Sequence, residues 1–294
     1  MNSPSPDPSA LAADAHAGFP ARRGGTKRTL ARAALSRALW SPEGARRLPR
    51  LAELDAALDG VTAADLEWVC ELSPLGPVYF LPTAEGVAAL AARIRELGVR
   101  RVVEVAAGDG FLSQCLREHG VAAVATDSGS WADPQARMRP EEALAMAGVE
   151  VPGVRMGAGV ERAEALDAIA THGPDLVLAA WLPPGDLLDR LIRAPVSYVL
   201  EIGAAGGATP GAWTWRFAHD FWEGPEAALN RCRLDLRPGR ETHTRVTLYF
   251  GGSHDEHFEE RPRRGDWLWQ FRPVAPKAPR AKNTSPVPSP RGEG

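Results

Sequence analysis

The stretch VVEVAAGDGFLSQCL, residues 102–116, decides the fold. It begins with a β-branched run, which favours a buried parallel strand. A turn of small residues at 106–110 follows, and a helical pattern begins at Phe111. Gly108 and Gly110 let the backbone turn sharply and approach a bound molecule closely. The stretch therefore predicts a strand, a ligand-binding turn and a helix in direct succession.

Strand and helix patterns alternate on both sides of this stretch. Such alternation predicts right-handed crossovers and a parallel sheet. The end of the chain differs, because the turn sequence Arg-Pro-Gly-Arg joins 231–236 to 242–250 and predicts an antiparallel hairpin. Thr83 and Asp186 are placed to cap helices. The other predicted strands are 99–105, 121–126, 154–156, 175–180 and 196–202, and the predicted helices are 83–97, 111–119, 141–147, 161–172 and 187–193.

The ends of the chain differ in composition from its middle. Residues 1–28 and 273–294 are rich in proline and small residues and lack an apolar period, which predicts disordered tails. Residues 29–82 carry leucines spaced as helix faces, and we expect them to form a helical, basic extension. Residues 83–272 then hold the α/β domain.

Charge is distributed unevenly around a net charge of −3. Residues 21–50 hold nine Arg or Lys residues against one acid, whereas 51–272 hold 21 basic and 33 acidic residues. A body this acidic is a poor general binder of nucleic acid. We therefore expect contact with nucleic acid only through 21–50. The arginines of 29–58 form either a solvated face or a surface for an anionic partner.

Three further features limit the class of protein. No apolar run reaches the roughly 18 residues that a membrane span needs, so we expect no membrane partner. The first residues lack the pattern of a secretory signal, which gives a cytoplasmic expectation. Cys70, Cys115 and Cys232 are odd in number and far apart, so we expect neither a disulfide framework nor a metal site.

An acid at the end of the second predicted strand indicates the kind of ligand. Asp127 lies seventeen residues beyond Gly110, where a carboxylate can accept hydrogen bonds from a ribose diol. A nicotinamide dinucleotide requires Gly-x-Gly-x-x-Gly, but Ser113 takes the third place and Asp109 would lie close to the pyrophosphate. A sulfonium amino acid brings positive charge, which Asp109 and Glu104 attract. The loop therefore favours S-adenosylmethionine, with Glu104 either receiving its amine or anchoring the loop amides.

This pattern resembles the class I S-adenosylmethionine-dependent methyltransferases over roughly residues 83–250. The family's first motif is an acid, one residue and Gly-x-Gly-x-Gly. Residues 104–110 read EVAAGDG, with alanine in place of the first glycine. The resemblance implies a doubly wound, mostly parallel seven-stranded α/β sheet that ends in an antiparallel hairpin, the Rossmann-like methyltransferase fold. It implies cofactor contacts from Glu104, Ala106, Gly108, Asp109, Gly110, Phe111, Asp127, Ser128, Glu161, Ala180 and Trp181.

Methyl transfer requires alignment of donor and acceptor more than a dedicated base. The resemblance places Trp181, Pro183 and Pro184 beside the transferred methyl group. This loop lacks the Asp or Asn that amine methyltransferases often carry there, and Glu161 is the candidate for the acid that holds the adenine amine. The expected function is methyl transfer to an unidentified small-molecule or protein acceptor. The alternative is a catalytically inactive member of the fold that binds a partner or RNA through its basic N-terminal arm.

Two apolar segments have two interpretations each. Residues 203–211, with the aromatics that follow up to Phe217, form either a substrate-side wall or a cover over core aromatics. Residues 72–82 include Tyr79 and Phe80, and they form either a lid over the cofactor mouth or a seal at one end of the core.

The histidines offer weaker indications. His219, beside Asp220, and His243 are candidates for a general base. A lone histidine is more often a surface residue or one whose ring nitrogens make structural hydrogen bonds. His254 and His257 lie among acids and resemble metal ligands in type. A solvated charge run is the commoner outcome for such a segment.

Overall fold

The computed structural model describes residues 26–133, 152–183, 185–205, 212–222 and 243–258. The chain divides into two compact units, 1–261 and 262–294, and every described residue belongs to the first. The predictions that fall outside the described residues are the tail up to residue 25, the helix 141–147, Pro184, the strand 231–236 and the tail 273–294.

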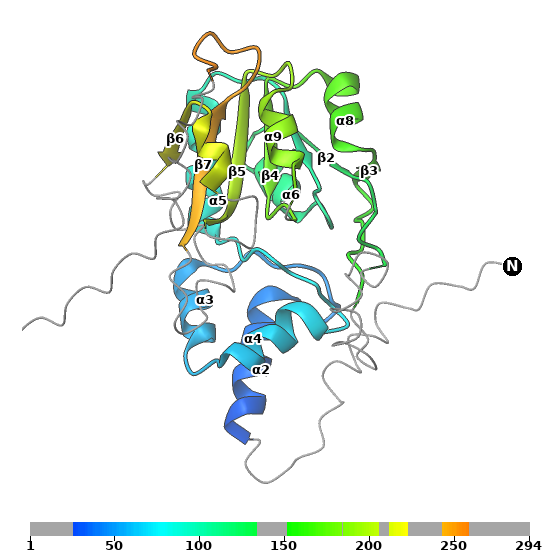
Figure 1. The fold of residues 1–294 in the computed structure, drawn as a ribbon. Helices are drawn as coiled ribbons and strands as arrows, with labels where there is room; N and C mark the ends of the chain where they lie inside the picture. The colour runs from blue at the N-terminus through cyan, green and yellow to red at the C-terminus, as the bar shows by residue number, and fades with distance from the viewer. Residues whose placement is uncertain (1–25, 134–151, 184, 206–211, 223–242, 259–294) are drawn as a thin grey trace, which may run out of the picture. The chain divides into compact units, whose positions relative to one another are not determined.

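The sheet domain follows the predicted alternation of strands and helices (Figure 1). No described helix is long and apolar enough to cross a membrane. The strands are β1 (Val102–Val105), β2 (Ala123–Asp127), β3 (Val160–Arg162), β4 (Leu176–Ala180), β5 (Tyr198–Ala205), β6 (His219–Trp222) and β7 (His243–Phe250). The helices are α5 (Ala84–Glu96), α6 (Phe111–Glu118), α8 (Ala165–His172), α9 (Leu187–Ile192) and the short 3-10 helix η3 (Ala212–Arg216).

The seven strands form one sheet in the order β3-β2-β1-β4-β5-β7-β6. Strands β1 to β5 run parallel to one another, and β7 runs antiparallel to both β5 and β6. The strand order reverses between β1 and β4, which is the kind of switch point where open α/β sheets bind ligands. The topology confirms the predicted doubly wound, mostly parallel seven-stranded sheet with an antiparallel ending.

One predicted strand lies elsewhere, and one observed strand was not predicted. The third strand is β3 and not 154–156, where Val154 instead donates its N–H to the carbonyl of Trp131. Strand β6 pairs antiparallel with β7 and stands at the end of the strand order, whereas the predicted strand 231–236 lies outside the described residues. Both strands are short, with three and four residues, so neither has the long apolar or alternating run that identifies a strand in sequence.

The two predicted helix caps have different outcomes. The Thr83 Oγ1 accepts a hydrogen bond from the Gly86 N–H at 3.2 Å and caps α5, as predicted. Asp186 occupies the cap position of α9, but its side chain makes no capping hydrogen bond, so that prediction was wrong. The backbone of Asp186 is helical there, and not extended as at Thr83, which removes the geometry that a side-chain cap needs.

Helices cover both faces of the sheet, and each face has its own apolar core. Helices α5 and α6 pack on one face, and α8 and α9 pack on the other. In α5 the buried residues recur at helical spacing, as Val87, Leu90, Ala91 and Ile94 show. Strand β1 is buried along its whole length, which explains a sequence that is apolar except for Glu104.

The extension forms a third apolar core from α2 (Thr26–Leu39), α3 (Leu51–Leu58), α4 (Ala63–Glu67) and the π-helical turn η1 (Trp68–Leu72). Helix α2 begins within the last residues of the segment predicted as a tail. Two hydrogen bonds join the extension to the start of α5, from the Leu51 N–H to the Glu85 carboxylate at 2.7 Å and from the Ala84 N–H to the Pro49 carbonyl at 2.9 Å. Leu48 also packs against the α5/α6 core.

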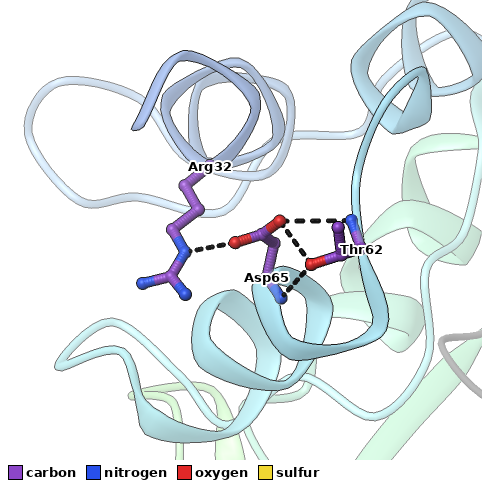
Figure 2. Close-up of polar contacts among 3 residues, drawn as sticks. All are labelled: Arg32, Thr62 and Asp65. Atoms are coloured by element: carbon purple, nitrogen blue, oxygen red, sulfur yellow. Dashed lines mark hydrogen bonds and ion pairs between the residues drawn. The ribbon is translucent and has the colours of Figure 1, made fainter. Parts of the chain in front are cut away.

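A buried carboxylate joins α2 to α4 within the extension (Figure 2). The Arg32 Nε donates to the Asp65 Oδ1 at 2.7 Å. The Asp65 Oδ2 accepts from the Thr62 hydroxyl at 2.6 Å and from the Thr62 N–H at 3.2 Å, which completes a capping box at the start of α4. The Arg32 guanidinium also lies over the Trp68 ring, 5.1 Å from its centroid. The ion pair therefore fixes α2 against α4.

Replacing Asp65 by alanine is expected to lower the free energy of unfolding by about 3–5 kcal/mol, because it strands a largely buried guanidinium and removes a helix cap. Urea unfolding followed by circular dichroism measures this loss. Glu53→Ala is the matched control, because the Glu53–Arg47 pair is 42% exposed on both sides and such pairs contribute about 0–1 kcal/mol. A loss at Asp65 no larger than the loss at Glu53 would contradict the role given to the buried pair.

Candidate functional site

A cavity of about 500 Å³ lies at the carboxyl ends of β1, β2 and β4. Its walls come from the turn after β1, the ends of β2 and β4, the segment before α5, and Arg46 of the extension, together with Trp131, Val154 and Arg155. The cavity thus occupies the switch point of the strand order. Its volume falls within the range of small-molecule sites.

The turn after β1 has a left-handed backbone at Ala106, Gly108 and Gly110, with φ of 51°, 56° and 73°. A Cβ on Gly110 would lie 2.5 Å from the Val160 Cγ2, and a Cβ on Gly108 would lie 3.2 Å from the Val154 Cγ1. Both positions therefore require glycine, because their backbone is left-handed and because a side chain there would collide with Val154 or with Val160 at the start of β3. The turn is held close to these two valines while its inner side lines the cavity.

The carboxylate of Asp127 connects the end of β2 to the turn. Its Oδ2 accepts from the Gly108 N–H at 2.9 Å, and its Oδ1 accepts from the Gly129 N–H at 2.6 Å. A third bond, from the Ala107 N–H to the Thr126 carbonyl at 3.0 Å, runs beside them. A carboxylate offers about four acceptor positions, so Asp127 retains acceptor capacity toward the cavity that it lines.

Glu104 lies near the end of β1 with its side chain buried. Its Oε2 accepts from the Ser113 N–H of α6 at 2.9 Å, so the carboxyl group anchors the helix and not the amides of the turn. Burial raises the pKa of Glu104 from 4.5 to about 7, and the nearby Asp109 charge adds to the rise. Glu104 also lines the cavity, where a cation would stabilise its ionised form.

Arg46 of the extension reaches across to the turn. Its Nη1 donates to the Asp109 Oδ2 at 2.8 Å, and its guanidinium lies over the Phe111 ring, 4.6 Å from the centroid. The Asp109 Oδ1 accepts from the Phe111 N–H at 3.1 Å. The negative charge of Asp109, which we expected to attract a cofactor, is thus already paired with Arg46. This pair places the Arg46 guanidinium at the cavity wall.

The loop after β4 forms another wall. Trp181 has φ of 61° and donates its N–H to the Ile202 carbonyl at 2.7 Å. The left-handed conformation of a bulky residue costs about 1–2 kcal/mol, so the packing around Trp181 must compensate for this strain. Trp181 packs against the α5/α6 core, whereas Leu182 is buried in the opposite core. Trp181, Pro183 and Ala180 line the cavity.

The segment before α5 satisfies both interpretations that its sequence allows. Residues 75–80 and Pro82 line the cavity, which fits a cover over the mouth. Phe80 also belongs to the α5/α6 core, and Leu81 belongs to the core of the extension. The cover is therefore anchored in two cores and leaves the half-buried Tyr79 at the cavity.

The cavity brings together most of the residues predicted to bind a cofactor. Three of them do not line it: Gly110, Ser128 and Glu161. Glu161 is exposed and pairs with the His172 Nε2 at 2.9 Å. The Ser128 hydroxyl accepts from the Ser130 N–H at 3.3 Å. The predicted residues that do line the cavity are Glu104, Ala106, Gly108, Asp109, Phe111, Asp127, Ala180 and Trp181.

Other candidates lie away from the cavity. Phe217 is buried in the α8/α9 core and Trp215 packs against that core, whereas residues 206–211 of the predicted wall or cover lie outside the described residues. The His219 Nδ1 lies 2.8 Å from the Phe217 carbonyl, and the His254 Nε2 lies 3.0 Å from the Tyr198 hydroxyl. Among the described residues no three His, Cys, Asp or Glu side chains are grouped to hold a metal.

The cavity residues that were not predicted as site residues include Arg46, Trp131, Val154 and Arg155. Arg46 and Asp109 are 63 positions apart, so no periodicity or local motif connects them. The only available signal for Arg46 was its place in the basic segment. Trp131 and Val154 are brought together by the hydrogen bond between their backbones.

No protein-family model and no curated protein matches the chain. Among solved structures it is similar to the 23S rRNA methyltransferase ErmE, with a TM-score of 0.32 and 17% identity over 60% of this chain and 70% of that one. A human methyltransferase 10 domain containing protein gives 0.34 and 12% over 67% and 96% of the two chains. The plantazolicin methyltransferase BpumL in complex with SAH gives 0.30 and 10% over 57% and 83%. These similarities concern the fold alone.

The raised pKa of Glu104 predicts a pH dependence of stability. The unfolded chain ionises this group above about pH 4.5 and the folded protein above about pH 7, so its burial lowers the free energy of unfolding progressively between these values. Glu104→Gln should therefore stabilise the free protein at pH 8 relative to pH 5, by on the order of 2–3 kcal/mol. Urea unfolding at both pH values measures the difference, with the exposed Glu118→Gln as control. Equal effects of Glu104→Gln at both pH values would contradict the shift.

Proposed function

We propose that the cavity binds S-adenosylmethionine and that the protein transfers its methyl group to a small-molecule or protein acceptor. The observation that carries the proposal is the Asp127 carboxylate, which lies at the cavity wall and is bonded to the Gly108 N–H of the turn. An acid at the end of β2 beside a glycine turn after β1 is the arrangement that holds a nucleoside ribose in doubly wound sheets.

The charges of the cavity suit this cofactor. Glu104, Asp109 and Asp127 bring carboxylates to the wall, and Arg46 and Arg155 bring guanidinium groups. S-adenosylmethionine carries a sulfonium, an ammonium and a carboxylate, so both signs of charge find a counterpart in the wall. Binding of the cation should also favour ionisation of Glu104, whose pKa of about 7 leaves it partly protonated in the free protein.

A nicotinamide dinucleotide fits this site less well. Its pyrophosphate would need free N–H groups at the start of α6. The Phe111 N–H is already donated to Asp109, and the Ser113 N–H is donated to Glu104. A pyrophosphate there would therefore displace two internal hydrogen bonds and meet two carboxyl groups.

The other end of the site supports methyl transfer by alignment. A bound sulfonium would supply an electrophilic methyl carbon, and the acceptor would displace the sulfur from that carbon in line. Trp181, Pro183 and Tyr79 supply rigid apolar walls, which suit a flat acceptor group. Among its described lining residues the cavity has no His, Lys or Cys. The acceptor proton therefore passes to a carboxylate or to solvent.

Thermal melting with S-adenosylmethionine, S-adenosylhomocysteine and NAD tests the cofactor assignment. At one hundred times the dissociation constant, either adenosyl ligand should raise the melting temperature by about 5–10 °C, and NAD should leave it unchanged. A shift with NAD alone would contradict the proposal. Formation of S-adenosylhomocysteine across a panel of flat and of protein acceptors then tests methyl transfer. Tight binding without turnover on any of them would count against that part.

Replacing Asp127 by alanine should abolish the melting shift, because both the ribose contact and the support of the turn are lost. Gly108→Val should do the same, because a branched side chain would meet Val154 and enter the turn. Asp175→Ala is the matched control. That carboxylate also accepts two backbone N–H bonds, from Arg100 and Arg101, but it lies at the amino end of β4, whereas the cavity lies at the carboxyl ends of the strands. Its ligand shift should stay intact, and an unchanged shift in both site variants would exclude this cavity.

A further inference from the structure

Arg46 is held rigidly where it meets the cavity. Trp40 is buried in the core of the extension and forms an antiparallel bridge with Arg46. The residues between them make a tight turn, in which the Ser41 N–H bonds to the Ala45 carbonyl at 2.8 Å and the Gly44 N–H bonds to the Ser41 carbonyl at 2.9 Å. This turn places the arginine against the sheet domain, and its position does not depend on the ion pair with the loop alone.

The Arg46 guanidinium is only partly satisfied in the protein. Its side chain is 16% exposed, and one nitrogen is bonded to Asp109. The Nε–H is buried and has no acceptor among the described residues. A buried donor without an acceptor is destabilising. The guanidinium therefore retains donors that an oxygen anion entering the cavity can engage, since the planar group presents five N–H donors in a fixed fork.

We infer that Arg46 binds the α-carboxylate of the methionyl part of the cofactor, so that the helical extension completes the cofactor site. This inference rests on the proposed function, because it places a group of S-adenosylmethionine. Asp127 is bonded to Gly108 and Arg46 is bonded to the next residue, Asp109. A ribose held at Asp127 thus directs the amino-acid tail along the turn toward the guanidinium.

The zwitterion of that tail matches the groups along the turn. Glu104 lines the cavity with a carboxyl group that a neighbouring ammonium would ionise. Arg46 lines it with the guanidinium that the carboxylate requires. Asp109 is paired with Arg46 and orients it, and the Phe111 ring supports the flat face of the guanidinium. Asp109 is therefore a positioning residue for Arg46 and does not contact the cofactor ammonium.

Isothermal titration calorimetry of the full chain with two ligands tests this assignment. S-adenosylhomocysteine carries the amino-acid tail, whereas 5′-methylthioadenosine has the same nucleoside and thioether sulfur without that tail. Arg46→Met keeps a long apolar side chain over Phe111 and removes the charge. It should weaken S-adenosylhomocysteine binding by about 10- to 100-fold and change methylthioadenosine binding by less than about threefold.

Two further variants make the result specific. Arg46→Lys retains the charge and should restore part of the lost affinity for S-adenosylhomocysteine. Arg47→Met is the matched control, because its ion pair with Glu53 is 42% exposed on both sides and lies outside the cavity lining. It should leave both affinities unchanged.

The outcomes separate this inference from the proposed function. Unchanged binding of S-adenosylhomocysteine to Arg46→Met overturns the inference and leaves the cofactor assignment in place. Equal weakening of both ligands also overturns it, because the arginine would then act only by shaping the turn. Failure of the unaltered chain to bind either ligand overturns the proposed function itself.

Discussion

The hydrogen bond from the Gly108 N–H to the Asp127 carboxylate is the contact on which the site depends. It joins the ends of two neighbouring parallel strands, β1 and β2, whose register is fixed along the sheet. The backbone at Gly108 is left-handed, with φ of 56°, a conformation that glycine adopts without steric cost. Asp127 is only 9% exposed, so its charge requires these donors. The same carboxylate that holds the turn faces the cavity.

The extension and the sheet domain contribute to one site. Hydrogen bonds from Leu51 and Ala84 tie the extension to the start of α5, and Leu48 packs against the sheet domain's core. Most of the segment 75–82 lines the cavity, and Arg46 bonds to Asp109 of the turn after β1. The buried Asp65 pair inside the extension therefore affects the cavity indirectly, since it fixes the helices that carry both walls.

The parts of the site that could be predicted from sequence are those with local causes. Gly108 and Gly110 have conformations that glycine alone adopts freely, and Asp127 stands at the end of the predicted second strand, so each left a signal in its own neighbourhood. The parallel pairing of β1 to β5 followed from the alternation of strand and helix patterns along the chain. Thr83 capped its helix for the same local reason.

The parts that could not be predicted depend on contacts distant in sequence or on very short elements. Arg46 can contact Asp109 only when the extension packs against the sheet domain. The sequence of the basic segment 21–50 does not indicate which of its arginines makes this contact. Strand β3 has only three residues, which is too short a pattern to locate it in the sequence, so the prediction placed it at 154–156 and not at Val160–Arg162. Glu161 then lies on β3, exposed and paired with His172, and not at the cavity.

A crystal structure of the full chain grown with S-adenosylhomocysteine tests the central claim most directly. The account predicts a nucleoside in the cavity, with both ribose hydroxyls within hydrogen-bonding distance of the Asp127 carboxylate and the Gly108 contact retained. A cavity filled by side chains, or a nucleoside bound elsewhere while Asp127 keeps only its backbone partners, would contradict it.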